Sequence, residues 1–150
     1  LTHTHPAVPK SSSLALQMLL YYNVPLSVVF FCLQLSVHIH KRNTFEYQQV
    51  MAILVPIFLP LYGMCEATRL YLGLSGNLGE KAASLSACLL LTIFPQAVFI
   101  IYLSFFQLAP LPIEHILGVP YCIVLVLELV FCYTTIKALI RKQTALFYRL

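Results

Sequence analysis

Charged residues are scarce in this chain. Nine Lys and Arg and five Asp and Glu occur among 150 residues, so charged side chains make up 9% of the sequence, against about a quarter in an ordinary soluble domain. A soluble chain of this size has to cover a large surface with polar groups. These few charges cannot do so, and we expect most of the protein to lie in a bilayer.

The usual signatures of catalysis and of cofactor binding are also missing. No two cysteines have the C-x-x-C spacing of a thiol oxidoreductase. His38 and His40 are two residues apart and would lie on opposite sides of a helix, while His115 stands alone near the start of the last apolar stretch. We find no nucleophile motif, phosphate-binding loop or paired-carboxylate site. The sequence therefore predicts no enzyme, no cofactor and no metal site, and it shows no basic stripe for nucleic acid.

What the chain does contain is four long apolar stretches: Leu20–Ile39, Val50–Leu72, Leu85–Ala109 and Ile113–Ile136. Each is close to or above the ~20 residues with which a helix crosses ~30 Å of hydrocarbon. They are continuous, unlike the alternating segments of about ten residues in a membrane β-barrel. The first is too long for a signal peptide and has no small-residue cleavage site. We therefore expect four transmembrane helices.

Short connections between these stretches make consecutive helices antiparallel. The predicted fold is an all-α membrane protein, an antiparallel four-helix transmembrane bundle. Residues 1–13 would form a flexible N-terminal tail, 14–137 the helical domain and 138–150 a basic C-terminal tail. No soluble domain is expected.

The orientation follows from the basic residues near the ends of the spans. Cytoplasmic loops of membrane proteins carry an excess of Lys and Arg. The side that holds the connection between the first and second spans has only Lys41 and Arg42. The side with both termini and the second loop has six basic residues: Lys10, Lys81, Lys137, Arg141, Lys142 and Arg149. Both termini are therefore predicted to be cytoplasmic, where the tail charges are also attracted to anionic lipid.

Three local features predict helix ends and bends. Ser13 is a suitable N-cap for a helix that begins at Leu14. Because Leu14–Ile39 is long for one straight span, Pro25 is expected to break it, with Leu14–Tyr22 partly in the interface. Gly73 is expected to end the second helix in the left-handed conformation, with Asn77 in the following turn.

Polar side chains recur on one face of three predicted helices. The intervals are three, four or seven residues, which place side chains on the same side of a helix. Glu128 is deep in the fourth helix, and Glu66 and Arg69 are expected in the cytoplasmic third of the second. The stripes are Asn23, Ser27, Gln34 and His38; Tyr62, Glu66 and Arg69; and Tyr121, Glu128 and Thr135. They would pack together at the centre of the bundle.

Two functions fit such stripes. One is interhelical hydrogen bonding, with each contact worth ~0.6 to 2 kcal/mol in lipid. The other is a proton or ion pathway through Glu128, because ionisable residues inside a span are costly and often functional. A transporter usually has several charges at mid-depth and discontinuous helices. Whether Glu128 lines an open cavity or packs against Arg69, Tyr62 or Gln34 would separate the two.

Several strings are specific enough to resemble a known family. They are Ser12-Ser13-Leu14-Ala15-Leu16-Gln17-Met18 with Tyr21-Tyr22-Asn23, Glu66-Ala67-Thr68-Arg69-Leu70-Tyr71-Leu72-Gly73, Gly76-Asn77-Leu78, Glu80-Lys81 and Leu111-Pro112-Ile113-Glu114. They resemble the ciliary tetraspan family of transmembrane protein 17, which also includes transmembrane proteins 216 and 80. The resemblance covers the chain from about Ser11 to the C-terminal basic segment.

The resemblance implies a structural subunit of the tectonic-like (Meckel syndrome) complex at the ciliary transition zone. Such subunits support the barrier between plasma and ciliary membranes, cilium assembly and Hedgehog signalling. The implied partners are tectonics, B9-domain proteins, related tetraspans and membrane lipid. The resemblance brings no catalytic residue, so the candidate interaction residues are Glu66, Arg69, Tyr62, Asn77, Glu128 and Gln34.

Overall fold

A computed structural model describes residues 12–44, 49–107 and 111–148 of the chain. Its elements are α1 (Leu14–Thr44), α2 (Gln49–Leu78), α3 (Ala82–Leu91), η1 (Thr92–Gln96), α4 (Ala97–Phe105) and α5 (Pro112–Phe147). The predicted N-terminal tail lies almost wholly outside the described residues.

The described helices make four spans, because α3, η1 and α4 follow one another as a single apolar unit. By length and composition four helical segments could cross a membrane: Leu14–Thr44, Ala52–Leu78, Ala82–Phe105 and Pro112–Phe147. No strand occurs in the part of the chain that the structure describes. The prediction of an all-α membrane protein with four transmembrane helices is confirmed, and this is a multi-pass membrane protein.

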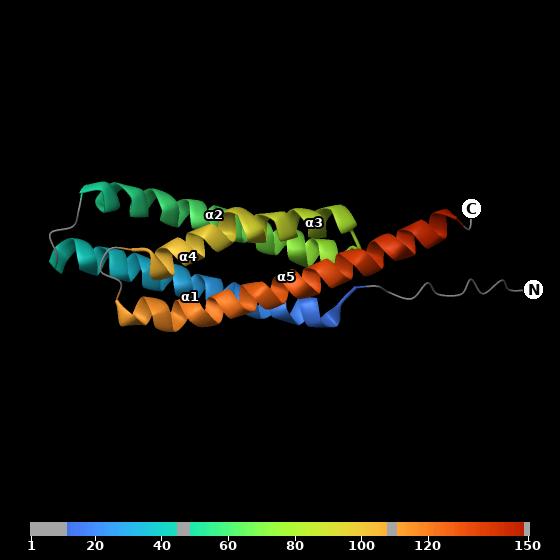
Figure 1. Ribbon diagram of the computed structural model, residues 1–150, viewed down its shortest axis with the longest axis horizontal. Coiled ribbons are helices and arrows are strands. Elements are labelled where there is room, and N and C mark those ends of the chain that lie inside the picture. Colours follow the sequence, from blue (N-terminus) through green and yellow to red (C-terminus); the bar gives the residue numbers. More distant parts are fainter. Residues whose placement is uncertain (1–11, 45–48, 108–110, 149–150) are drawn as a thin grey trace, which may run out of the picture.

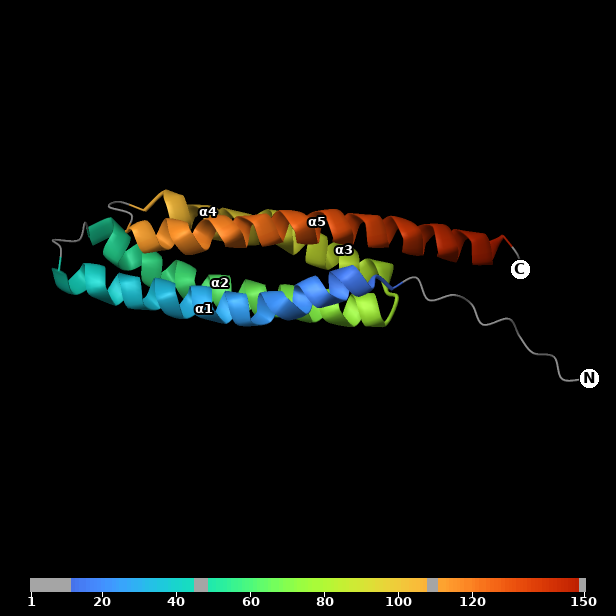
Figure 2. The same cartoon turned by 90° about the horizontal axis from the view of Figure 1, so that it is seen from below.

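The spans run alternately up and down in one elongated bundle (Figures 1 and 2). α1 packs against both α2 and α5, α2 packs against α3, and α4 and α3 pack against α5. The start of α1 and the end of α5 lie at the same end of the bundle (Figure 1). Each span therefore touches its neighbours in sequence, and the last also touches the first. That this end is cytoplasmic remains a prediction.

The start of α1 follows the predicted cap, but its course does not follow the predicted break. The Oγ atom of Ser13 accepts a hydrogen bond from the backbone N–H of Leu16 at 3.3 Å, and α1 begins at Leu14. The helix then continues through Pro25 to Thr44, so the expected break there is wrong. Leu16 and Leu20 are fully buried, so the first turns of α1 pack against the other helices of the bundle.

The predicted end of the second helix at Gly73 is also wrong. Gly73 lies inside α2, which continues to Leu78, and no described glycine has a positive φ. A Cβ atom at Gly73 would lie 3.0 Å from side-chain atoms of both Leu20 and Cys88. Glycine is therefore needed for close packing against α1 and α3. The left-handed residue is Glu80 (φ 50°), in the turn between α2 and α3.

Of the prolines in the spans, only Pro95 coincides with a break. Residues Thr92–Gln96 form a π-helical turn in which Phe94 leaves helical geometry, and the Phe94–Pro95 peptide bond is cis. The other prolines, Pro25, Pro56, Pro60 and Pro120, lie inside continuous helices. Membrane helices tolerate prolines in their interior. The third span is therefore the discontinuous one.

The last helix is longer than the predicted span. α5 has 36 residues, about 54 Å at the rise of an α-helix, and its final turns project past the other helices (Figures 1 and 2). The segment expected to be a basic tail is thus helical as far as Phe147. Lys142 in it pairs with Glu80 at 2.7 Å, which ties the projecting helix to the turn between α2 and α3.

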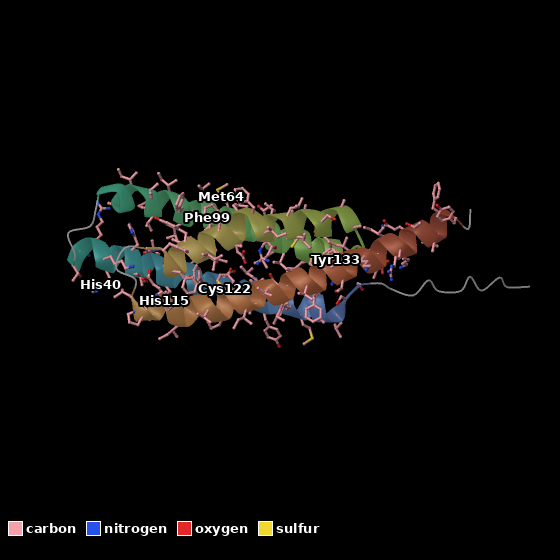
Figure 3. All side chains as sticks on the ribbon, viewed as in Figure 1. His40, Met64, Phe99, His115, Cys122 and Tyr133 are labelled. Carbon is pink, nitrogen blue, oxygen red and sulfur yellow. The ribbon has the colours of Figure 1, made fainter. Side chains whose placement is uncertain are left out.

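The outside of the bundle is apolar and the inside contains the polar groups. Large apolar side chains cover the exterior, among them Met64, labelled in Figure 3, which is 69% exposed. The interior has two apolar layers, one around Phe30 and Ile100 and one around Leu20 and Leu85. Buried Asn23, Glu66, Arg69 and Glu128 lie between them along the helices. This inside-out distribution fits a lipid solvent.

The orientation of the bundle is open to a direct test. With six basic residues against two, we expect both termini in the cytoplasm and residues 40–49 outside. A glycosylation acceptor on a short linker inserted after Thr44 should be modified, and one inserted after Gly79 should not. Modification of the second site alone would reverse the orientation.

Candidate functional site

The guanidinium of Arg69 is the centre of the candidate site. Arg69 is fully buried on α2, and Glu66 one turn earlier on the same helix faces it. Its Nε and Nη2 atoms donate to the two oxygens of Glu66 at 2.9 and 2.7 Å, in a bidentate pair. Glu66 lies close to the middle of the Ala52–Leu78 span, not in its cytoplasmic third, because α2 continues past Gly73. The pair is therefore deep in the span.

Glu128 of α5 completes the neutralisation of Arg69. The Nη1 atom of Arg69 donates to Glu128 Oε2, while Asn23 Nδ2 of α1 donates to Glu128 Oε1 at 2.8 Å. The same Nη1 atom approaches Thr92 Oγ1, at the start of η1, at 3.5 Å. Glu128 is 2% exposed. All four spans thus contribute to one hydrogen-bonded network around Arg69, in which α1 takes part through Glu128, and both oxygens of Glu128 are held.

Two tyrosines extend this contact into the apolar layer. Tyr121 of α5 donates its hydroxyl hydrogen to Glu66 Oε1 at 3.1 Å. Its hydroxyl is also 2.7 Å from that of Tyr62, and because Tyr121 has one hydrogen, Tyr62 is the donor in that bond. We call Asn23, Tyr62, Glu66, Arg69, Thr92, Tyr121 and Glu128 the Arg69 cluster. It contains two carboxylates and one guanidinium, so its acidic groups outnumber its basic groups by one.

A second buried polar cluster lies towards the other end of the bundle. Lys41, at the end of α1, is 1% exposed and donates to Glu114 at 2.7 Å and to Gln107 at 3.0 Å. Glu114 also accepts from the backbone N–H of Leu111 at 2.7 Å. Gln34 belongs here, because its amide donates to the Leu103 carbonyl at 3.3 Å and accepts from Gln107 at 3.4 Å. Lys41, counted in the sequence analysis among the basic residues near the ends of the spans, is a buried cation.

Asn77 forms a third polar contact, between the end of α2 and the start of α1. Its Oδ1 atom accepts from the Ser13 backbone N–H at 3.0 Å. Its Nδ2 atom donates to the Ser13 carbonyl at 2.9 Å and to Gln17 Oε1 at 2.8 Å. Asn77 therefore joins two helix ends, 64 residues apart in sequence.

The structure brings together four of the six candidate residues. Tyr62, Glu66, Arg69 and Glu128 share one cluster, whereas Gln34 and Asn77 belong to the other two contacts. Sequence reasoning missed Thr92, Lys41, Gln107 and Glu114. Lys41 and Glu114 could have been found: in an antiparallel bundle the end of the first span lies at the level of the start of the last. Thr92 carried no such signal, because a threonine in an apolar span is common.

The described residues contain no group of three or more His, Cys, Asp or Glu side chains arranged to hold a metal ion. The polar groups of the Arg69 cluster donate to and accept from one another. These hydrogen bonds hold the four spans at fixed depths relative to one another.

Replacing Arg69 tests how much the bundle depends on it. Arg69→Leu would leave two buried carboxylates without their cation, and breaking a buried pair in this way costs about 3–5 kcal/mol. We expect a large loss of thermal stability of the purified protein in detergent. Thr68→Leu is the matched control, because Thr68 is exposed and bonds only to its own helix, at the Met64 carbonyl. Equal melting temperatures for the two variants would contradict the role given to Arg69.

Replacing Asn77 tests the contact at the helix ends. Asn77→Ala removes three hydrogen bonds and leaves the Ser13 backbone groups without them, at about 1–3 kcal/mol for a buried group. We expect faster backbone hydrogen exchange in the first turns of α1, with the middle of α1 unchanged. Asn43→Ala, at an exposed position of the same helix bundle, should leave both regions as they are. Unchanged exchange near Leu16 would show that Asn77 is dispensable.

Comparison with known proteins identifies the family of the chain. A family model, Transmemb_17, described as a predicted membrane protein, matches residues 18–126. Transmembrane protein 17 of Homo sapiens is 33% identical over 141 residues, which cover 91% of this chain and 69% of that protein. The same protein of Gallus gallus is 34% identical over 144 residues, covering 91% of this chain and 65% of that protein.

Relatives of a second name also match the chain. Transmembrane protein 216 of Homo sapiens is 30% identical over 113 residues, which cover 75% of this chain and 77% of that protein. No solved structure matches the chain. The matched region includes α1 from Met18, α2, the third span and α5 as far as Val126, and so contains all of the Arg69 cluster except Glu128. The chain therefore belongs to the transmembrane protein 17 family of multi-pass membrane proteins.

Proposed function

We propose that this protein is a structural membrane subunit of the tectonic-like (Meckel syndrome) complex at the ciliary transition zone. In that role it supports the diffusion barrier between plasma and ciliary membranes, cilium assembly and Hedgehog (smoothened) signalling. Its partners are tectonics, B9-domain proteins, related tetraspans and membrane lipid, and it acts without catalysis. Membership of the transmembrane protein 17 family supports the proposal.

The observation that carries a structural role is the closed state of the Arg69 cluster. Both oxygens of Glu128 are engaged, by Arg69 and by Asn23, and the residue is buried. Apolar layers lie on both sides of the cluster along the bundle. A group that carries a proton across a membrane needs water or a cavity beside it. A carboxylate held between an arginine and an asparagine instead fixes helix positions.

One observation favours the second candidate, a small proton- or ion-coupled carrier that uses Glu128. The third span is broken at η1, and transporters often build their sites from broken helices. Gln96, in the same turn, is fully buried, and neither atom of its amide has a hydrogen-bond partner. A carrier would use these groups to bind water or an ion next to Thr92.

Glu128→Gln separates the two candidates. The substitution keeps the shape of the side chain and an amide that can hydrogen-bond, but removes the titratable group. Arg69 also keeps Glu66 as its bidentate partner. We therefore expect a scaffold to tolerate the change: the variant should reach the transition zone, beside a basal-body marker, and restore cilia in cells lacking the protein at matched expression.

The opposite result is equally clear. Failure to restore cilia, with normal abundance and localisation, would overturn the scaffold and support the carrier. Glu128→Leu is the matched control, because it removes both the proton and the hydrogen bonds. We expect its abundance to fall, which would show that the assay detects loss of the cluster itself.

A further inference from the structure

A groove on the outside of the bundle reaches the Arg69 cluster from the lipid side. It lies between α1 and α2 and has a volume of about 320 Å³. Its walls include Val28 and Phe31 of α1, and Gly63 and Ala67 of α2. Glu66, the acidic partner of Arg69 on α2, also lines it. The groove is thus mostly apolar, and one residue of the cluster, Glu66, is part of its lining.

Small residues make this groove. Gly63 and Ala67 are four apart and share one face of α2, with Ser27 opposite them on α1. Small residues at this spacing let the backbones of membrane helices approach each other closely. A Cβ atom at Gly63 would lie 3.4 Å from the Phe31 ring, an ordinary contact. Packing within the chain therefore does not require glycine at this position, in contrast to Gly73.

The charge of the cluster adds an independent requirement. Glu66 and Glu128 share one guanidinium, so buried acidic side chains outnumber buried cations by one in the middle of the span. Buried charges in lipid are normally paired. Within the part of the chain that the structure describes, the other buried cation, Lys41, is already paired with Glu114. Glu66 has room for another donor: a carboxylate accepts about four hydrogen bonds, and Glu66 accepts three.

We propose that this groove docks a transmembrane helix of a partner protein, and that this helix brings a Lys or Arg side chain to Glu66. The inference rests on the proposed function only in taking the partner to be another membrane protein. Apolar side chains of the partner helix fill the space over Gly63 and Ala67, and its cation balances the excess carboxylate. Recognition is then specific, because apolar contacts alone do not favour a protein helix over lipid tails.

Charge complementarity favours this occupant over two others. A lipid acyl chain fills the groove but leaves the carboxylate unbalanced. A second copy of this chain has no exposed cation at mid-span among the described residues, since both Lys41 and Arg69 are buried. A helix from a different protein can bring the missing charge at the depth of Glu66.

A defined peptide tests the proposal with the full chain. The labelled protein is reconstituted in phosphatidylcholine vesicles with a labelled synthetic helix of about 20 Leu and Ala residues, carrying one central Lys. The control peptide has Leu at that position. Energy transfer at increasing peptide density gives the affinity, and we expect the Lys peptide to bind at least about tenfold more tightly.

Two variants with equal added volume locate the contact. Ala67→Leu fills the groove without touching the Arg69 cluster and should remove the preference for the Lys peptide. Ala138→Leu, at an exposed position of α5, should leave it unchanged. Gly63→Leu serves as a second groove-filling variant, and a melting temperature close to wild type shows that each variant is folded.

The contrary outcomes are distinct. Equal binding of the Lys and Leu peptides, or equal effects of Ala67→Leu and Ala138→Leu, would overturn the proposal and leave lipid as the occupant. Energy transfer between two labelled copies that Ala67→Leu abolishes would assign the groove to self-association. None of these measurements involves cilia, so their failure leaves the proposed function standing.

Discussion

The structure depends on one buried guanidinium. Arg69 stays charged at any accessible pH, and a charge at the centre of a span is tolerated only when protein groups replace the water around it. Its five donor hydrogens point in fixed directions, so the carboxylates have to be positioned around the guanidinium. Glu66 does so from the same helix, and Glu128 does so from α5. The depth of α5 relative to α2 is therefore set by this contact.

Apolar packing alone could not set those depths. In a bilayer, a leucine facing another leucine is hardly better placed than one facing a lipid tail, so the two apolar layers tolerate sliding. Interhelical hydrogen bonds, in contrast, form only at one axial position of the helices. The Arg69 cluster, the Lys41–Glu114 pair and the Asn77 contact lie at three levels of the bundle. Together they give the helices one register, which the close approach of α2 to α1 and α3 at Gly73 reinforces.

Hydropathy and periodicity were sufficient to predict the number of spans, their antiparallel order and the inward direction of the polar stripes. They could not predict where helices break or end. Whether a proline breaks a helix depends on the packing around it, so Pro25 and Pro95 have different outcomes with the same local chemistry. Gly73 has a similar ambiguity: glycine serves either a left-handed turn or a close approach, and only the positions of Leu20 and Cys88 decide between them. Local sequence holds no information on such neighbours.

The same physics links the interior to the proposed assembly. Most donors and acceptors of the Arg69 cluster bind one another, and its acidic side chains outnumber its cations by one. Of the two acidic residues, Glu66 lines the groove on the outside of the bundle between α1 and α2. In hydrocarbon an unbalanced charge is costly, so the bundle is more stable with a cationic neighbour than alone. In the proposed assembly, the pairing of buried acidic side chains with cations would hold the helices of this subunit together and hold the subunit to its partner.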